Sequence, residues 1–201
     1  MKIIPISIFT AVLLSFVLST TAFAQSEKNE MERAVGRDEI PENALELIDE
    51  FWPDLQGIKY FLETDGNLTT YEAKLDWGGD QFSIEFSTDG YVLDVEKLIS
   101  FETIPESVRN AITSHLDSQF DRYRLTRIQQ QFIARDEDDE DDSDFIDDIL
   151  EGDAEDYEIR YEIVLDGQNK QELGSFEKLY SNSGSILEKR KVVRRSLDNI
   201  W

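Results

Sequence analysis

Long stretches of the chain alternate apolar and polar residues with a period of two, the pattern of a β-strand that buries one face. In the run 71–77 the apolar positions are Tyr71, Ala73, Leu75 and Trp77. The turn signals Asp65-Gly66-Asn67 and Gly78-Gly79 separate this run from its neighbours. Because clean alternation is typical of antiparallel sheets, the sequence predicts an antiparallel sheet with one buried face and one face in water.

Two other segments carry apolar residues at helical spacing, and each begins at a proline, which suits the first position of a helix. The first begins at Pro41, ends before Pro53 and has a stripe formed by Ala44, Leu47, Ile48 and Phe51. The second begins at Pro105, and its stripe is formed by Val108, Ala111, Ile112, Leu116 and Phe120. Each stripe is the natural cover for the buried face of a sheet.

The order of one helix followed by several strands occurs twice. The helices open on Ile40-Pro41-Glu42 and Ile104-Pro105-Glu106, and the closing turns are Asp89-Gly90 and Ser183-Gly184. We therefore predict an α+β fold of two tandem repeats, residues 40–100 and 101–195. Each repeat is expected to pack one helix on an antiparallel four-stranded meander sheet.

The two ends of the chain are predicted to lie outside the folded repeats. Residues 1–24 have the features of a signal peptide, with Lys2, an apolar run over 6–18 and the cleavage site Ala22-Phe23-Ala24. Cleavage would give a periplasmic or secreted protein without stable membrane insertion, and a retained N-terminal anchor is the alternative. Residues 25–39 are predicted to form a flexible polar lead-in, and residues 196–201 a short tail.

Acidic side chains outnumber basic ones by 44 to 20, and the formal net charge is −24. Such a surface repels nucleic acid and attracts cations or a basic partner surface, although the charge also serves solubility alone. The chain contains no cysteine. The sequence therefore excludes disulfides, thiol catalysis and cysteine–zinc sites.

Residues 136–156 form an acidic insertion in the second repeat that is much longer than an ordinary hairpin loop. Repulsion between its carboxylates predicts that most of it is disordered. A short amphipathic helix, able to dock on the body of the protein or on a partner, is indicated by the spacing of Phe145, Ile146, Ile149 and Leu150.

The acidic insertion is also a candidate calcium site, because carboxylate oxygens suit this ion. The candidate ligands are Asp136, Asp138, Glu140 and Asp142. No register of the insertion fits the twelve-residue calcium loop, so loose condensation of cations is the alternative. The basic strand end at 189–195 is a further candidate contact for the insertion, within one chain or between two chains.

No catalytic apparatus is evident in the sequence. The single histidine, His115, lies beside Ile112 and Leu116 and is interpreted as a residue at the edge of the core. Motifs for a nucleophile elbow, a zinc protease or a phosphate-binding glycine loop are absent from the sequence. We therefore predict that the protein is not an enzyme and uses no cofactor, calcium excepted.

Several short motifs follow one order along the chain: the Ile-Pro-Glu helix starts, the helix ends Trp52-Pro53 and Phe120-Asp121, the Tyr-Glu pairs at 71 and 161, and Asp89-Gly90. Together they resemble the PepSY-like domains, also called beta-lactamase-inhibitor-like (BLIP-like) domains, over residues 40–195. The resemblance implies a helix on an antiparallel sheet in each of two copies, and binding or inhibition of periplasmic proteins without enzymatic activity. The acidic insertion and Ser183-Gly184 depart from the pattern. The disulfides of the true inhibitors are also absent, so their particular target is not carried over.

The first hypothesis for function is an exported module that recognises or inhibits a periplasmic protein or peptide through the wet faces of its sheets. A sheet continuous across both repeats would form one concave platform. The candidate contact residues are Phe61, Glu72, Lys74 and Glu85. Phe61 is out of phase with the core face of its strand and would be the anchor, or else a packing residue under a loop. The alternative function is a calcium-binding or cation-binding envelope protein that acts through residues 136–156.

Overall fold

The computed structural model describes residues 26–28, 30–134, 141–154 and 156–192. Its strands are β1 (Ser26–Lys28), β2 (Glu30–Val35), β3 (Lys59–Asp65), β4 (Leu68–Trp77), β5 (Asp80–Phe86), β6 (Val92–Leu98), β7 (Arg122–Ile133), β8 (Glu158–Gln168), β9 (Leu173–Ser181) and β10 (Ile186–Val192). Its helices are α1 (Glu42–Phe51), α2 (Glu106–Gln119) and α3 (Asp142–Glu151), with short 3-10 turns η1 (Arg37–Glu39) and η2 (Phe101–Thr103). The predicted signal peptide and the predicted tail lie outside the described residues.

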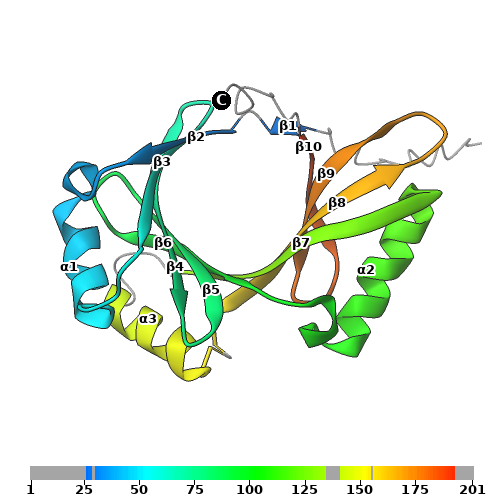
Figure 1. The fold of residues 1–201 in the computed structure, drawn as a ribbon. Helices are drawn as coiled ribbons and strands as arrows, with labels where there is room; N and C mark the ends of the chain where they lie inside the picture. The colour runs from blue at the N-terminus through cyan, green and yellow to red at the C-terminus, as the bar shows by residue number, and fades with distance from the viewer. Residues whose placement is uncertain (1–25, 29, 135–140, 155, 193–201) are drawn as a thin grey trace, which may run out of the picture.

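All ten strands belong to one sheet, in the order β1-β10-β9-β8-β7-β6-β5-β4-β3-β2. Neighbouring strands are antiparallel from β2 to β10, whereas β1 runs parallel to β10. A single residue separates β1 from β2, yet these strands hold opposite ends of the sheet. The sheet is therefore bent until its two edges approach each other, and Figure 1 shows the resulting ring with all three helices on its outside.

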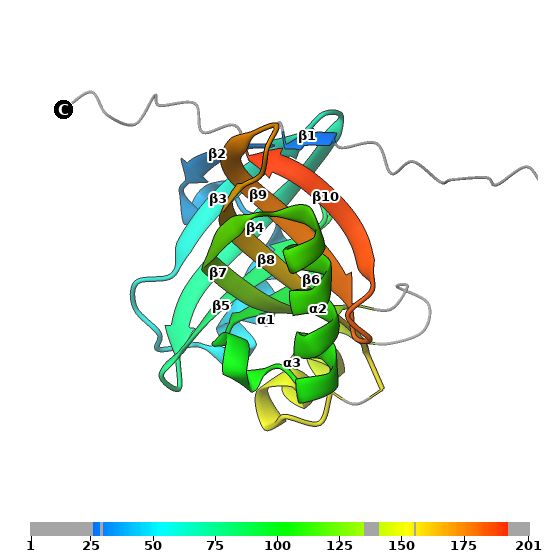
Figure 2. The ribbon, with the colours of Figure 1, turned by 90° about the vertical axis from the view of Figure 1, so that its right-hand side faces the viewer.

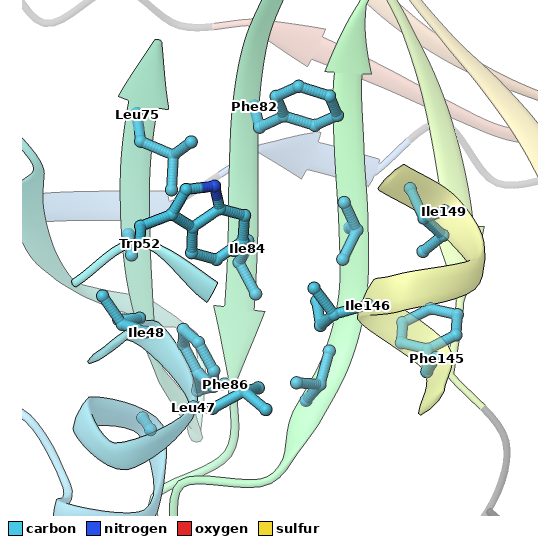
Figure 3. Close-up of a cluster of buried hydrophobic side chains, with 14 of the residues drawn as sticks. Leu47, Ile48, Trp52, Leu75, Phe82, Ile84, Phe86, Phe145, Ile146 and Ile149 are labelled. Carbon is cyan, nitrogen blue, oxygen red and sulfur yellow. The ribbon is translucent and has the colours of Figure 1, made fainter. Parts of the chain in front are cut away.

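The apolar face of the sheet points outward and is covered by the helices in two clusters. Helices α1 and α3 cover the first cluster, and Figure 3 shows Ile48 and Trp52 on one side of it and Ile146 on the other. Helix α2 covers the second cluster, where Ile112 meets Ile163 and Tyr180; Figure 2 shows this helix crossing the strands. The polar residues that alternate with these core residues consequently face the inside of the ring.

The predicted fold of two tandem repeats, each with its own four-stranded sheet, is wrong. Strand β6 pairs with β7 across the predicted boundary, from Asp94 opposite Ile133 to Leu98 opposite Gln129. An unpaired strand edge leaves a row of backbone donors and acceptors open, and joining two such edges satisfies both rows. Hydrophobic periodicity records which face of a strand is buried and carries no information about which strand lies beside it.

The predicted flexible lead-in at 25–39 also differs from the structure, in which it contains β1, β2 and η1. Strand β2 pairs with β3 from Glu30 opposite Asp65 to Val35 opposite Tyr60. Most of β2 is exposed, so its side chains show no apolar alternation. Backbone pairing holds this strand, and composition does not record backbone pairing.

The acidic insertion is ordered over much of its length. Phe145, Ile146 and Ile149 of α3 are buried in the first cluster, so the predicted amphipathic helix docks on the body of the protein. Asp141 caps the start of the helix, and its side chain accepts a hydrogen bond from the Ser143 amide at 3.0 Å. Gly152 caps the end of the helix in the left-handed conformation that favours glycine.

Gly90 and Gly184 allow two hairpins to press against the starts of α1 and α2. Gly90 has φ +89°, and a Cβ atom there would lie 2.9 Å from the Ala44 backbone nitrogen; Gly184 has φ +80°, and its Cβ would lie 2.8 Å from the Ala111 Cβ. We expect Gly90→Ala to lower the free energy of unfolding by about 2 kcal/mol, through backbone strain and the close contact together. Urea denaturation measures the loss.

Gly79 provides the matched control for this prediction. It has φ +93°, but no atom lies within 4 Å of the position that its Cβ would take. Gly79→Ala therefore tests backbone strain alone, which is expected to cost about 1 kcal/mol. Equal losses at the two positions would contradict the tight packing inferred at Gly90.

Candidate binding cavity inside the sheet

The inner face of the ring encloses a cavity of about 420 Å³. Ten carboxylates and four basic groups are among its lining residues: Glu32, Glu63, Asp65, Leu68, Thr70, Glu72, Lys74, Ser83, Glu85, Asp94, Glu96, Arg127, Gln131, Arg160, Glu162, Glu177, Leu179, Glu188 and Arg190. These residues come from β2 to β10, because each strand directs every second side chain inward. The polar half of the alternation seen in the sequence thus converges on one acidic interior.

One end of the interior is organised around the ammonium group of Lys74. Its Nζ lies 2.8 Å from Glu32 Oε1 and 2.8 Å from Glu72 Oε2, and 4.6 Å from the centre of the Phe61 ring. Glu72 also accepts a hydrogen bond from Ser83 Oγ. Burial disfavours the ammonium, but its hydrogen bonds to the two carboxylates outweigh burial and raise the pKa of Lys74. The protein's own Lys74 ammonium thus occupies a cation site formed by two carboxylates and an aromatic ring.

A second group of acids lies on β6. Burial, followed by the negative charges of Glu96 and Glu85, raises the pKa of Asp94 well above its ordinary value, against the effect of a hydrogen bond from Gln131. Burial, followed by the charge of Glu162, raises the pKa of Glu96 to about 8, and Arg127 acts in the opposite direction. The interior thus holds more negative charge than its own basic groups neutralise.

Two glutamines of β7 supply donors to these acids and leave their acceptors open. Gln131 Nε2 donates to Asp94 Oδ2 at 3.1 Å, and Gln129 Nε2 donates to Glu96 Oε2 at 2.5 Å. Gln129 is 4% exposed, and neither Gln129 Oε1 nor Gln131 Oε1 has a hydrogen-bond partner among the described residues. A buried acceptor without a donor is costly, so the wall of the cavity at Gln131, which is one of its lining residues, is suited to a group that donates hydrogen bonds.

The two edges of the sheet are also held together by side chains. Arg190 Nη1 of β10 lies 3.6 Å from Asp65 Oδ2 of β3, and 4.0 Å from Glu177 Oε1. This Arg190–Asp65 ion pair joins the two sides of the sheet, because β10 and β3 lie next to its opposite edges. It reinforces the closure of the ring, in which β1 pairs with β10, β2 pairs with β3 and one residue joins β1 to β2.

The structure brings the four predicted contact residues together. Glu72, Lys74 and Glu85 line the cavity, and half-buried Phe61 lies directly below the Lys74 ammonium. Sequence reasoning missed Asp94 and Glu96, although their alternation with Val95 was visible. Arg190, which joins the two edges, gave no signal because its role depends on the closure of the ring.

The predicted calcium ligands are not brought into this cavity. Asp136, Asp138 and Glu140 lie outside the described residues, and Asp142 Oδ2 accepts a hydrogen bond from the Val92 amide at 3.0 Å. Calcium binding by the insertion therefore stays a prediction.

Within the part of the chain that the structure describes, the carboxylates that approach one another as metal ligands would are Glu32, Glu63 and Glu72, with oxygen atoms within 4.8 Å. The Lys74 ammonium already binds two of them, so an additional metal ion would have to displace it. The trio therefore fits an ammonium group as it stands and does not fit a resident metal.

The single histidine lies at the edge of the second cluster, as predicted. His115 Nδ1 is 2.9 Å from Tyr180 Oη, and the two rings meet edge to face. Burial, followed by the charges of Lys178 and Lys189, lowers the pKa of His115 to about 4. The imidazole is thus neutral at pH 7 and contributes to packing.

Comparison with known proteins finds no matching family model and no matching curated protein. A DUF2874 family protein from Bacteroides ovatus is similar in structure, with 14% identity, coverage of 76% of this chain and 87% of its own, and a TM-score of 0.51. A protein from Bacteroides eggerthii, provisionally assigned to the periplasm, has 14% identity, coverage of 76% and 88%, and a TM-score of 0.52. A BLIP-like protein from Bacteroides fragilis has 14% identity, coverage of 81% and 92%, and a TM-score of 0.48, too low to support an argument.

The similarities to the Bacteroides ovatus and Bacteroides eggerthii proteins establish a shared fold. PepSY-like membership is not confirmed and stays a prediction. Among the described residues, no helix combines the length and the apolarity needed to cross a membrane.

Proposed function

We propose that the protein is an exported, non-enzymatic binding module, and that it takes a basic segment of a protein or peptide into the acidic interior of its ring. The observation that carries the proposal is the excess of carboxylates in the cavity, ten against four basic groups. The predicted signal peptide and the fold neighbour provisionally assigned to the periplasm support export.

The charge of the interior favours a cationic ligand over a neutral or anionic one. Burial, followed by repulsion from Glu162, keeps Glu96 protonated at neutral pH, since its pKa is about 8. A bound ammonium or guanidinium group would stabilise the ionised form of Glu96 and release its proton. Affinity should therefore increase as the pH rises toward 8.

The acceptor of Gln131 favours a ligand with N–H groups. Gln131 lines the cavity, its Oε1 has no partner among the described residues, and its Nε2 donates to Asp94 Oδ2. Lysine and arginine side chains donate several hydrogen bonds from one cation, so they can satisfy acceptors and carboxylates together. The Lys74 contacts with Glu32, Glu72 and Phe61 illustrate the same recognition within the chain.

Isothermal titration with a hexalysine peptide at pH 9 tests the proposal, because Glu96, with its pKa of about 8, is then ionised. In the first variant Glu85→Gln, Glu96→Gln and Glu162→Gln neutralise three interior acids. We expect it to bind about tenfold more weakly than the wild type, equivalent to about 1.4 kcal/mol, because charge-assisted contacts are lost.

Calcium chloride at micromolar concentration, added in place of the peptide, tests the alternative function of the acidic insertion.

A surface variant with the same net charge is the necessary control, because any acidic protein attracts hexalysine. Asp54→Asn, Glu102→Gln and Glu106→Gln neutralise three exposed acids outside the cavity. We expect this variant to lose less than about twofold in affinity, since exposed charges are screened. Equal losses in both variants would reject the interior as the binding site.

A further inference from the structure

Two lysines lie side by side on the outer face of the sheet, near the C-terminal end of α2. Lys178 of β9 and Lys189 of β10 are direct cross-strand partners. Like charges directly opposite each other destabilise a sheet. The arrangement is unexpected in a chain with 44 acidic and 20 basic side chains, in which carboxylate partners are abundant.

No carboxylate among the described residues forms an ion pair with either lysine. Glu172, the acid whose charge acts on Lys178, binds Lys191 instead, with its Oε2 2.9 Å from Lys191 Nζ. Lys178 is 4% exposed, and its Nζ lies 5.3 Å from the centre of the Phe120 ring. A charge buried to this extent normally has an anionic partner.

The two lysines line a separate small cavity. It has a volume of about 60 Å³ and is also lined by Gln119, Asn169 and Glu172. About 10 to 15 Å³ of such space holds one water molecule, so only a small ligand fits. His115 of α2 is influenced by the charges of both lysines. Its imidazole is neutral at pH 7 and does not balance their charge.

We propose that this cavity is a binding site for a small oxyanion, held between the ammonium groups of Lys178 and Lys189. The site is independent of the acidic interior, because these side chains point to the opposite face of the sheet. Burial, followed by repulsion from Lys189, lowers the pKa of Lys178 to about 8, and Glu172 acts weakly in the opposite direction. A bound anion would favour the charged form and raise this pKa.

Titration with inorganic phosphate, bicarbonate or acetate at constant ionic strength tests the site, with NMR signals of the lysine side chains as the readout. We expect saturable binding of at least one anion, with Kd near or below about 1 mM. The pKa of Lys178 should rise by at least about one unit on saturation. The three anions distinguish a tetrahedral from a planar ligand.

Three variants make the result decisive. Lys178→Met and Lys189→Gln should each weaken binding at least about tenfold, whereas Lys59→Gln on distant β3 should leave it unchanged. Lys189 is half-buried, so its variant remains informative if Lys178→Met does not fold. Absence of saturable binding up to about 20 mM anion, or equal weakening in Lys59→Gln, would overturn the proposal.

Discussion

Replacing Phe145 by alanine is expected to lower the free energy of unfolding by about 3 to 5 kcal/mol, as is typical for truncation of a buried aromatic residue. Phe145 belongs to the acidic insertion, yet it is 1% exposed. Its ring meets that of Tyr157 edge to face, with centroids 4.9 Å apart. Tyr157, the residue just before β8, donates a hydrogen bond from its Oη to Asp148 Oδ2 of α3 at 2.8 Å. This bond connects the start of β8 to α3.

Urea denaturation measures this loss, and Leu173→Ala provides the control. Leu173 is 75% exposed, so its truncation should change stability by less than about 0.5 kcal/mol. If Phe145→Ala were as mild as Leu173→Ala, α3 would not be part of the core. The expected loss also means that deleting residues 136–156 would damage the fold, so cation binding by the insertion is better tested with single carboxylate variants.

The location of α3 shows what the sequence could and could not predict. The spacing of Phe145, Ile146 and Ile149 predicts an amphipathic helix, because apolar residues four apart share a face. The same spacing does not identify what covers that face. The covering surface is the edge of the first cluster, which exists only after α1 and β3 to β6 have packed.

The candidate site was predictable in part for a similar reason. Alternation along β4 and β5 places Glu72, Lys74 and Glu85 on one polar face, and the structure has all three in one cavity. A polar face was expected to be in water, where carboxylates keep ordinary pKa values. The bend of the sheet encloses that face, and neither the bend nor the pairing of β1 with β10 is recorded in the local pattern.

Replacing Glu96 by glutamine is expected to stabilise the protein increasingly as the pH rises. A carboxyl group whose pKa is raised in the folded state binds its proton more tightly there than in the unfolded chain. The contribution of this tighter proton binding to the free energy of unfolding is therefore complete below the unfolded-state pKa of about 4.3. It is lost as the pH rises to the folded-state pKa of about 8. The loss amounts to about 1.4 kcal/mol per pH unit within that window.

Glutamine keeps the shape of Glu96 and cannot ionise, so the variant does not undergo this loss. We expect the difference in the free energy of unfolding between Glu96→Gln and the wild type to grow by about 3 to 4 kcal/mol between pH 5 and pH 8. Urea denaturation at each pH gives this difference. The lowered pKa values of His115 and Lys178 favour stability at higher pH, but they affect both proteins equally and cancel in this difference. Removal of the Glu96 charge also makes the pKa of Asp94 less raised, and this change adds to the difference in the same direction.

Glu102→Gln serves as the control, because Glu102 is exposed and its neutralisation should give a difference independent of pH. If the difference in the free energy of unfolding between Glu96→Gln and the wild type were also independent of pH, Glu96 would ionise in the folded protein at its ordinary pKa. The interior would then be well solvated, and its carboxylates would already be balanced by water and counterions. In that case the excess of negative charge would no longer favour a basic ligand there, so this measurement also tests the physical basis of the proposed function.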